Sequence, residues 1–248
     1  MGKLTGSDIA RAALRTPLLQ ATWNYERQQG LGWAWALKPA LDRFYPDAER
    51  RRARLTEHTA YFNTQPTMAS LALGAVAGLE ERVAAGEIGP EVVTRGKHAL
   101  GSALAALGDR LFWATLRPFA SCLGVIAALG GSWRGAAILW IVYNSVHLPL
   151  RFGGVSWGYR RGPEVLDPTL RRGFERMVRG LSLLGAAAVG VAIAVILAPA
   201  GQPRTVAFQA ALLGGLGLGL LTAIRARPSP TQWALGVGAL CLAAGWWR

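Results

Sequence analysis

Charged residues are scarce in this chain of 248 residues. They make up 17% of the sequence, whereas a soluble domain usually carries about 25%. Hydrophobic residues make up 52% and arrive in blocks that short polar stretches separate. Because a helix satisfies its own backbone hydrogen bonds inside a bilayer, these apolar blocks predict an all-α integral membrane protein.

Acidic residues are scarcer still, with 14 Asp and Glu against 27 Lys and Arg and a net charge of +13. A strongly basic chain is often a nucleic-acid-binding protein, which carries its basic residues on a soluble face. Here the arginines cluster in short stretches between apolar runs, as they do in the loops of membrane proteins. The distribution of charge therefore indicates a membrane protein that does not bind nucleic acid.

Cysteines, metal ligands and catalytic motifs are also lacking. Cys122 and Cys241 have no CxxC spacing and no histidine partner, so we expect two small buried side chains. His58, His98 and His147 do not have the spacing of metal ligands. No Walker A, Ser-His-Asp or H-E-x-x-H pattern occurs. We therefore expect no metal, no cofactor and no catalytic residues in this chain.

Composition divides the chain into four zones. Residues 1–60 contain no apolar stretch long enough for a signal peptide or a span, and the charged run at 47–58 is interpreted as a solvated helical face. The zones expected are cytoplasmic or interfacial amphipathic helices at 1–60, a broken-helix core region at 61–158, a basic cytoplasmic loop at 159–179, and transmembrane helices at 180–248. The last zone holds three apolar spans without acidic residues, at 180–198, 206–224 and 232–247.

Polar residues interrupt the apolar stretches of the core region. The stretch 67–79 has 13 residues, whereas a full span needs about 20, so we expect a re-entrant or buried segment there. The stretch 111–129 contains Arg117-Pro118, and the stretch 136–150 contains Asn144 and His147. Because ionisable residues at membrane depth normally face a cavity or a partner, function is expected in this region.

The arginine-rich loops indicate a topology. Short arginine-rich loops stay in the cytoplasm, which would put residues 159–179 inside, Arg204 outside, and Arg225 and Arg227 inside. We therefore expect a multi-pass protein of the bacterial inner membrane, with its N-terminus in the cytoplasm and its C-terminus outside.

Short motifs follow one another along the first two thirds of the chain. They are WNYER within the segment 19–41, YFNTQP at 61–66, Leu79-Glu80-Glu81, Leu107-Gly108-Asp109, Thr115-Leu116-Arg117-Pro118, and then Asn144, His147 and Arg151. In this order they resemble the IID membrane subunit of the mannose/fructose/sorbose family of sugar phosphotransferase systems. The sequence departs from the family pattern at Gln65, where the family has histidine, and at Arg110, where a serine is usual.

The resemblance implies a function in sugar import. A IID subunit pairs with a IIC membrane subunit to form the translocation unit, in which core domains move against a scaffold like an elevator. The soluble IIB and IIA domains carry the phosphate and pass it to the sugar at the membrane, so the IID subunit carries none. The resemblance further implies a trimer of IIC–IID pairs.

The same resemblance identifies the residues expected to matter. Those expected on the sugar path or at the IIC interface are Asn63, Thr64, Gln65, Glu80, Glu81, Asp109, Thr115 and Arg117. Those expected to serve structure and packing are Trp23, Asn24, Glu26, Arg27, Gly108, Asn144, His147 and Arg151.

The residue chemistry leaves alternatives open at three of these places. Asn63-Thr64 precedes an expected helix start, where either side chain fits a helix cap. Glu80-Glu81 fits a solvated helix end, an ion pair, or a sugar contact inside the membrane. Asp109 and Arg117 lie near two helical turns apart, which suits an ion pair that braces a broken helix as well as a ligand contact.

A second function stays open beside sugar import. The departures at Gln65 and Arg110 also fit a IID-derived membrane protein that does not transport and has a regulatory or scaffolding role. A stand-alone membrane enzyme ranks last, because the sequence has no catalytic constellation.

Overall fold

The computed structural model describes residues 2–129 and 131–197. The predicted spans at 206–224 and 232–247, with their flanking arginines and Cys241, lie outside the described residues. Within them the chain forms helices and no strand, and its β-type pairings are the isolated bridges Asn24–Gln28 and Gln28–Phe62. The prediction of an all-α protein is therefore confirmed for this part of the chain.

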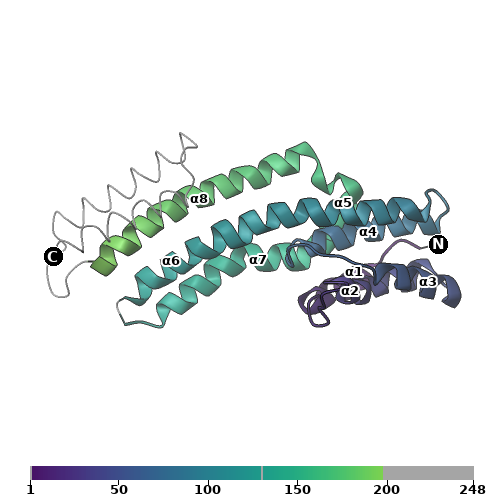
Figure 1. Cartoon of the computed structure of the whole chain (residues 1–248), viewed down its shortest axis with the longest axis horizontal. Coiled ribbons are helices and arrows are strands. Elements are labelled where there is room, and N and C mark those ends of the chain that lie inside the picture. The colour runs from purple at the N-terminus through teal and green to yellow at the C-terminus, as the bar shows by residue number, and fades with distance from the viewer. Residues whose placement is uncertain (1, 130, 198–248) are drawn as a thin grey trace. The chain divides into compact units, whose positions relative to one another are not determined.

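The helices follow one another along the chain, and the two longest connections, 19–29 and 59–68, carry the WNYER and YFNTQP motifs (Figure 1). They are α1 (Gly6–Arg15), the 3-10 helix η1 (Thr16–Leu18), α2 (Gly30–Phe44), α3 (Ala48–His58), α4 (Ala69–Ala84), α5 (Pro90–Gly108), the π-helix η2 (Asp109–Leu116), α6 (Arg117–Ala128), α7 (Arg134–Arg161), the 3-10 helix η3 (Gly162–Leu166) and α8 (Pro168–Leu197).

Polar caps fix the starts of the first helices. α1 begins with a capping box, in which Asp8 N donates to Thr5 Oγ1 over 3.2 Å and Thr5 N donates to Asp8 Oδ2 over 3.0 Å. α3 follows Asp47, whose carboxylate accepts from Arg50 N over 2.7 Å. Before α2, Gln28 has a positive φ of 53°, so the backbone turns sharply into the helix there.

The chain forms two compact units. Unit 1 comprises Met1–Ala114 with Ile141–Glu175, and unit 2 comprises Thr115–Trp140 with the chain from Arg176 onward. In unit 1, α2 packs against α1, α3 and α4, and α4 packs against α5. The largest buried side chains of this unit include Trp33, Phe44, Tyr45 and Phe62, so the N-terminal helices are part of a packed core.

Small residues let α4 and α7 approach closely within unit 1. A Cβ added to Gly74 would lie 2.0 Å from a carbonyl oxygen of α7, and one added to Gly158 would lie 2.1 Å from a carbonyl oxygen of α4. The spacings Ser70-x-x-x-Gly74 and Gly154-x-x-x-Gly158 match the small-residue pattern of packed membrane helices. Any larger side chain at either glycine would push the helices apart.

The apolar stretches at 100–108 and 111–129 belong to one continuous helix, Pro90–Ala128, and are not separate short segments. Asp109 and Arg110 do not end it, because the backbone passes into the wider π-helix η2 and returns to α-geometry at α6. Pro118 lies in the first turn of α6, where its missing N–H is tolerated. Among the described residues, this helix of 39 residues is long and apolar enough to cross a membrane.

The structure corrects the expected loop at 159–179. These residues form the end of α7, the 3-10 helix η3 and the start of α8, and Asp167 alone lies outside a helix. Short connections suffice because Pro163 and Pro168 each stand near the start of a helix, where proline fits. Their basic character is unchanged, and their cytoplasmic location stays a prediction.

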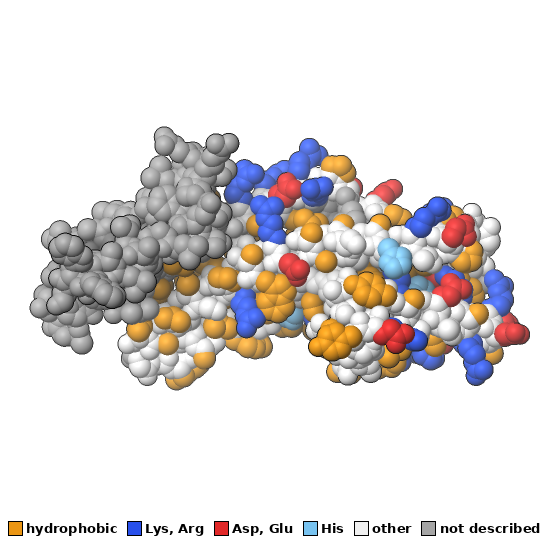
Figure 2. Space-filling view, viewed as in Figure 1, with side chains coloured by type: hydrophobic (Ala, Val, Ile, Leu, Met, Phe, Trp, Pro, Cys, Tyr) orange, Lys and Arg blue, Asp and Glu red, His pale blue; other side chains and the backbone are white. Residues whose placement is uncertain are grey.

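Unit 2 exposes large hydrophobic side chains. They are Val125, Leu129, Trp133, Leu139 and Trp140, with exposed fractions from 40% to 79%. Figure 2 shows hydrophobic side chains spread over the surface of α6 and the first part of α7. A soluble domain rarely exposes so many, whereas lipid solvates them, so this surface agrees with a membrane protein.

Candidate functional site

Two of the sequence motifs, WNYER at 23–27 and YFNTQP at 61–66, pair with each other. Gln29 N donates to the Phe62 carbonyl over 2.9 Å. The Gln29 side chain then holds the backbone of Thr64 at both ends, donating from Nε2 to its carbonyl over 2.7 Å and accepting from its N–H over 3.1 Å. Asn24 shapes the first motif, because its Oδ1 accepts from Arg27 N over 2.8 Å. The two motifs thus form one structural element.

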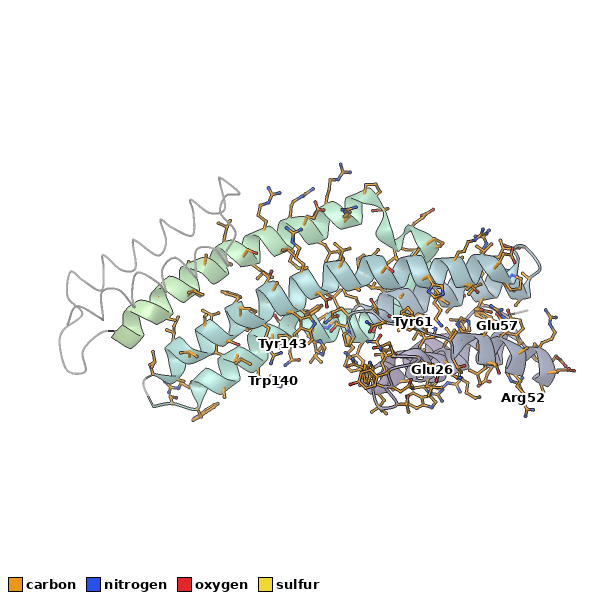
Figure 3. All side chains as sticks on the ribbon, in the orientation of Figure 1. Glu26, Arg52, Glu57, Tyr61, Trp140 and Tyr143 are labelled. Atoms are coloured by element: carbon orange, nitrogen blue, oxygen red, sulfur yellow. The ribbon has the colours of Figure 1, made fainter. Side chains whose placement is uncertain are left out.

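The outer side of these paired motifs carries aromatic and polar side chains. Those exposed there are Trp23, Tyr25, Glu26, Tyr61 and Asn63. Figure 3 labels Glu26 and Tyr61 among them. Aromatic faces, a carboxylate and an amide are the groups that bind sugars or fill protein interfaces.

Gln65 braces the turn that leads into α4, whose N-cap residue Met68 has no side-chain cap, so the expected cap from Asn63 or Thr64 is not present. Gln65 Oε1 accepts from Thr67 N over 2.7 Å and from Met68 N over 3.0 Å. The longer side chain reaches the free N–H groups, while Asn63 stays exposed. The Thr64 hydroxyl is buried without a hydrogen-bond partner among the described residues. At this position the glutamine that replaces the family's histidine therefore has a structural task.

Glu80 is fully buried, with 0% of its surface exposed, and it joins three helices. Oε2 accepts from the Tyr45 hydroxyl over 2.7 Å and from Arg54 Nε over 3.2 Å, and Oε1 accepts from Arg54 Nη2. His58 Nε2 lies 2.8 Å from Oε1. Of the alternatives for this residue, the solvated helix end is wrong and the ion pair is right. Because both oxygens are engaged inside the chain, Glu80 does not face a sugar here, which corrects its expected role.

The network around Glu80 fixes the protonation of His58. Trp33 Nε1 donates to His58 Nδ1 over 3.3 Å, so Nδ1 is an acceptor and Nε2 carries the proton that reaches Glu80. Burial lowers the pKa of His58 despite the carboxylate beside it, which keeps the ring neutral. Burial alone would raise the pKa of Glu80, but the hydrogen bonds from His58 and Arg54 outweigh it and lower the pKa to about 2. Glu80 is therefore ionised at any physiological pH.

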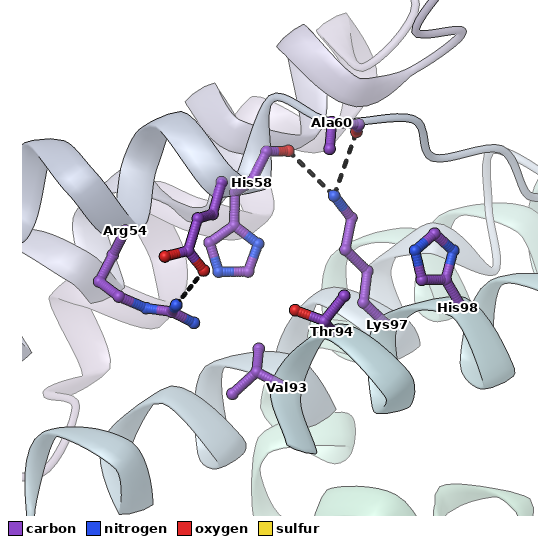
Figure 4. Close-up of a pocket in the computed structure, with 8 residues that line it drawn as sticks. Arg54, His58, Ala60, Val93, Thr94, Lys97 and His98 are labelled. Carbon is purple, nitrogen blue, oxygen red and sulfur yellow. Dashed lines mark hydrogen bonds and ion pairs between the residues drawn. The ribbon is translucent and has the colours of Figure 1, made fainter. Parts of the chain in front are cut away.

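Arg54 and His58 correct the interpretation of residues 47–58 as a solvated face, since both are buried. Beside them lies Lys97 of α5, also buried, whose Nζ donates to the carbonyls of His58 and Ala60 over 3.0 and 3.2 Å (Figure 4). The cavity between these residues has a volume of about 30 Å³. This is room for a water molecule or two and not for a sugar.

Glu81 also has a partner within the chain. The Tyr159 hydroxyl of α7 donates to Glu81 and accepts from Leu4 N over 3.2 Å, so the carboxylate ties α4 to α7 and to the N-terminal segment. Glu81 is half-buried, which rules out the fully solvated helix end for this residue as well.

Four more of the predicted residues lie in the π-helix η2 or directly next to it. Gly108 precedes it and packs on Gln65, because a Cβ at Gly108 would lie 2.5 Å from the Gln65 Cβ. Asp109 is exposed in unit 1, whereas Thr115 is buried and Arg117 exposed in unit 2. π-Helical turns are frequent at functional sites. The pairing of Asp109 with Arg117 stays a prediction.

The predicted residues of α7 lie along one face of the helix, and His147 contacts the turn before α4 there. His147 Nδ1 lies 2.8 Å from Thr67 Oγ1, and its ring stacks on Tyr143 with centroids 5.3 Å apart. Asn144 is half-buried. Arg151, one turn beyond His147, is 9% exposed and donates from Nη2 to the Thr16 carbonyl over 2.7 Å.

Sequence reasoning missed Tyr45, Arg54 and Lys97 and gave His58 no role. The spacing of Arg54 and His58, four residues apart, was a usable signal because it places both on one helix face. Lys97 had none, since a single lysine in a polar stretch does not reveal burial. Among the described residues, no three side chains of the metal-ligating types come together.

Comparison with known proteins places these features in a family. The family model described as PTS system mannose/fructose/sorbose family IID component matches residues 3–208. The mannose-specific EIID component of Escherichia coli strain K12 is 37% identical over 193 residues, which cover 77% of this chain and 68% of that protein. The sorbose-specific EIID component of Klebsiella pneumoniae is 33% identical over 192 residues, which cover 77% of this chain and 70% of that protein.

Solved structures agree with the sequence relatives. A chain in the cryo-EM structure of the mannose transporter ManYZ with microcin E492 aligns with a TM-score of 0.63 and 31% identity, covering 98% of this chain and 97% of that chain. A second chain, described as a membrane protein, aligns with a TM-score of 0.70, the same identity and the same coverage.

Proposed function

This chain belongs to the mannose/fructose/sorbose family of phosphotransferase-system IID components, and we propose that it imports a sugar together with a IIC subunit. One observation supports the partnership most strongly. The chain aligns over 98% of its length with a chain of the mannose transporter ManYZ. The relatives are specific for mannose or sorbose by name, so a sugar of that class is the substrate we propose.

We propose that the phosphate comes from soluble IIB and IIA proteins and that this chain carries none. The basic residues at 159–179 suit a cytoplasmic surface against which a IIB domain docks. The assembly proposed is a trimer of IIC–IID pairs in the bacterial inner membrane. The N-terminus lies in the cytoplasm and the C-terminus outside.

Within the chain, we propose that the exposed outer side of the paired motifs and the π-helix face the IIC subunit or the sugar path. Asn63 and Asp109 are exposed polar side chains in these places, and Arg117 follows directly after the π-helix. Thr64 and Thr115, in the same two segments of the chain, are buried. Glu80, Glu81 and Gln65 serve the fold through the hydrogen bonds they already make.

Sugar uptake tests the proposal. The chain is co-expressed with its IIC, IIB and IIA proteins in a bacterial strain without a mannose-type permease, and uptake of labelled mannose, fructose and sorbose is measured. Uptake of at least one sugar that needs this chain is expected. Asp109→Asn should lower it, whereas Asp42→Asn, which breaks the surface ion pair of Asp42 with Lys38, should leave it unchanged.

The departures at Gln65 and Arg110 keep one rival in view, a IID-derived protein that regulates or scaffolds without transport. The hydrogen bonds that Gln65 accepts from Thr67 N and Met68 N give this residue a structural task, which favours an ordinary fold at this position. A complex with the IIC subunit that takes up none of the three sugars would favour the rival.

A further inference from the structure

Arg151 is a buried cation with little to compensate its charge. It is 9% exposed, and the hydrogen bond from its side chain goes to a backbone carbonyl, that of Thr16. No carboxylate of the described residues forms an ion pair with it. A guanidinium has five N–H donors, and burying an ion without a counter-charge costs several kcal/mol.

The rest of the chain cannot supply the missing carboxylate side chain. Residues 110–163, which include most of α7, contain no Asp or Glu, and residues 198–248 contain none either. The buried or half-buried acids of unit 1 have other partners: Asp8 pairs with Arg11, Glu80 with Arg54, Glu81 with Tyr159, and Asp167 with Arg161. The counter-charge of Arg151 therefore comes from outside this chain.

Lys97 is a buried cation whose charge is compensated within the chain. Its ammonium group donates to two backbone carbonyls and lies 5.8 and 5.6 Å from the ring centres of Trp33 and Phe62, which attract a cation. It also borders a cavity with room for water. Arg151 has one such carbonyl, whereas Arg54, the third buried cation of unit 1, is paired with Glu80.

We propose that Arg151 receives a carboxylate from the IIC subunit, an inference that rests on the proposed function. The planar fork of a guanidinium matches the two oxygens of a carboxylate, and such pairs recur where charges are buried at interfaces. A lipid phosphate fits less well, because Arg151 lies about 15 Å along α7 from the basic end of the helix at Arg161. A neutral sugar does not balance the charge.

The test compares Arg151→Met with Lys97→Met in the complex and in the isolated full-length chain. The probe is the IIC subunit that co-purifies with the unmodified chain. Affinity for it is measured in detergent, and the melting temperature of the isolated chain is measured beside it. Arg151→Met should weaken the affinity about 30-fold or more, because the partner's carboxylate is left buried and unpaired. The isolated chain should melt at the same temperature or higher, because an uncompensated charge has gone.

The control has the opposite profile. Lys97→Met removes internal hydrogen bonds, so it should lower the melting temperature of the isolated chain and leave the affinity unchanged. Arg151→Lys should retain part of the affinity, and one Asp or Glu of the IIC subunit, changed to its amide, should reproduce the loss. These results together support the proposal.

Four results overturn it. If Arg151→Met leaves the affinity for the IIC subunit unchanged, the contact with a carboxylate is refuted while the proposed function is not. An equal loss of melting temperature in chain and complex assigns Arg151 to the fold, and loss of a bound anionic phospholipid from the isolated chain assigns it to lipid. If the unmodified chain captures no IIC subunit, the proposed function fails and the inference fails with it.

Discussion

Replacing Glu80 with glutamine should destabilise unit 1 strongly. The carboxylate receives hydrogen bonds from Tyr45, from two nitrogens of Arg54 and from His58. A glutamine has one oxygen and turns an NH₂ group toward these donors. His58 cannot adapt by moving its proton to Nδ1, because Nδ1 already accepts from Trp33. At least one donor and the charge of Arg54 are left without a partner.

The structure sets the size of the loss. Removing one partner of a buried ion pair costs about 3–5 kcal/mol. Arg54 keeps its second carboxylate, Glu57, whose side chain is 51% exposed, so the lower end of that range applies. For a chain of this size, about 3 kcal/mol lowers the melting temperature by roughly 6–12 °C.

The assay is thermal unfolding of the detergent-purified chain, followed by tryptophan fluorescence, with Glu81→Gln as the matched control. Glu81 is half-buried and accepts from one hydroxyl, so its loss should cost about 1 kcal/mol and roughly 2–4 °C. Equal shifts for the two adjacent substitutions would refute the assignment of Glu80 as the brace between α2, α3 and α4.

Two further predictions concern the pH dependence of the stability and the close approach of α4 and α7. Below pH 6.5 the melting temperature should fall, because folding lowers the pKa of His58. The unfolded chain takes up the proton at a higher pH than the folded chain does, so the stability present above pH 6.5 is lost as the pH falls through the pKa of folded His58. Glu80, with a pKa of about 2 against 4.5, adds a second loss between pH 4.5 and 2. A profile flat from pH 6.5 to 4.5 would contradict the first loss, and a profile flat from pH 4.5 to 2 would contradict the second. Gly158→Ala should lower the melting temperature by forcing α4 and α7 apart. Gly153→Ala is the control, because no atom lies within 4 Å of the new Cβ, and it should leave the free energy of unfolding unchanged or raise it by up to about 1 kcal/mol. Equal effects of the two substitutions would refute the close crossing of α4 and α7.

Much of the fold and the family could be predicted from the sequence. The apolar blocks predicted helices, and the motif order predicted the IID family, because both depend on local patterns. The close crossing of α4 and α7 also had a local signal, the spacing of Gly154 and Gly158, which sequence reasoning passed over.

The buried polar network could not be predicted, for a physical reason. Residues 47–58 are dense in charge, and a local pattern does not show which arginine meets a carboxylate 26 residues away, as Arg54 meets Glu80. Continuity of the helix through Asp109 and Arg110 was likewise hidden, because charged residues after an apolar stretch usually mark a helix end and π-helical turns are rare. Glu80 was correctly predicted to be important, but its role is structural, because it binds Tyr45, Arg54 and His58 within the chain.

The most direct test of the account is to purify the tagged, unmodified chain from its native membranes and identify what comes with it by mass spectrometry. A IIC-type subunit in an amount equal to this chain is expected. Recovery of the folded chain with no IIC-type subunit would contradict it.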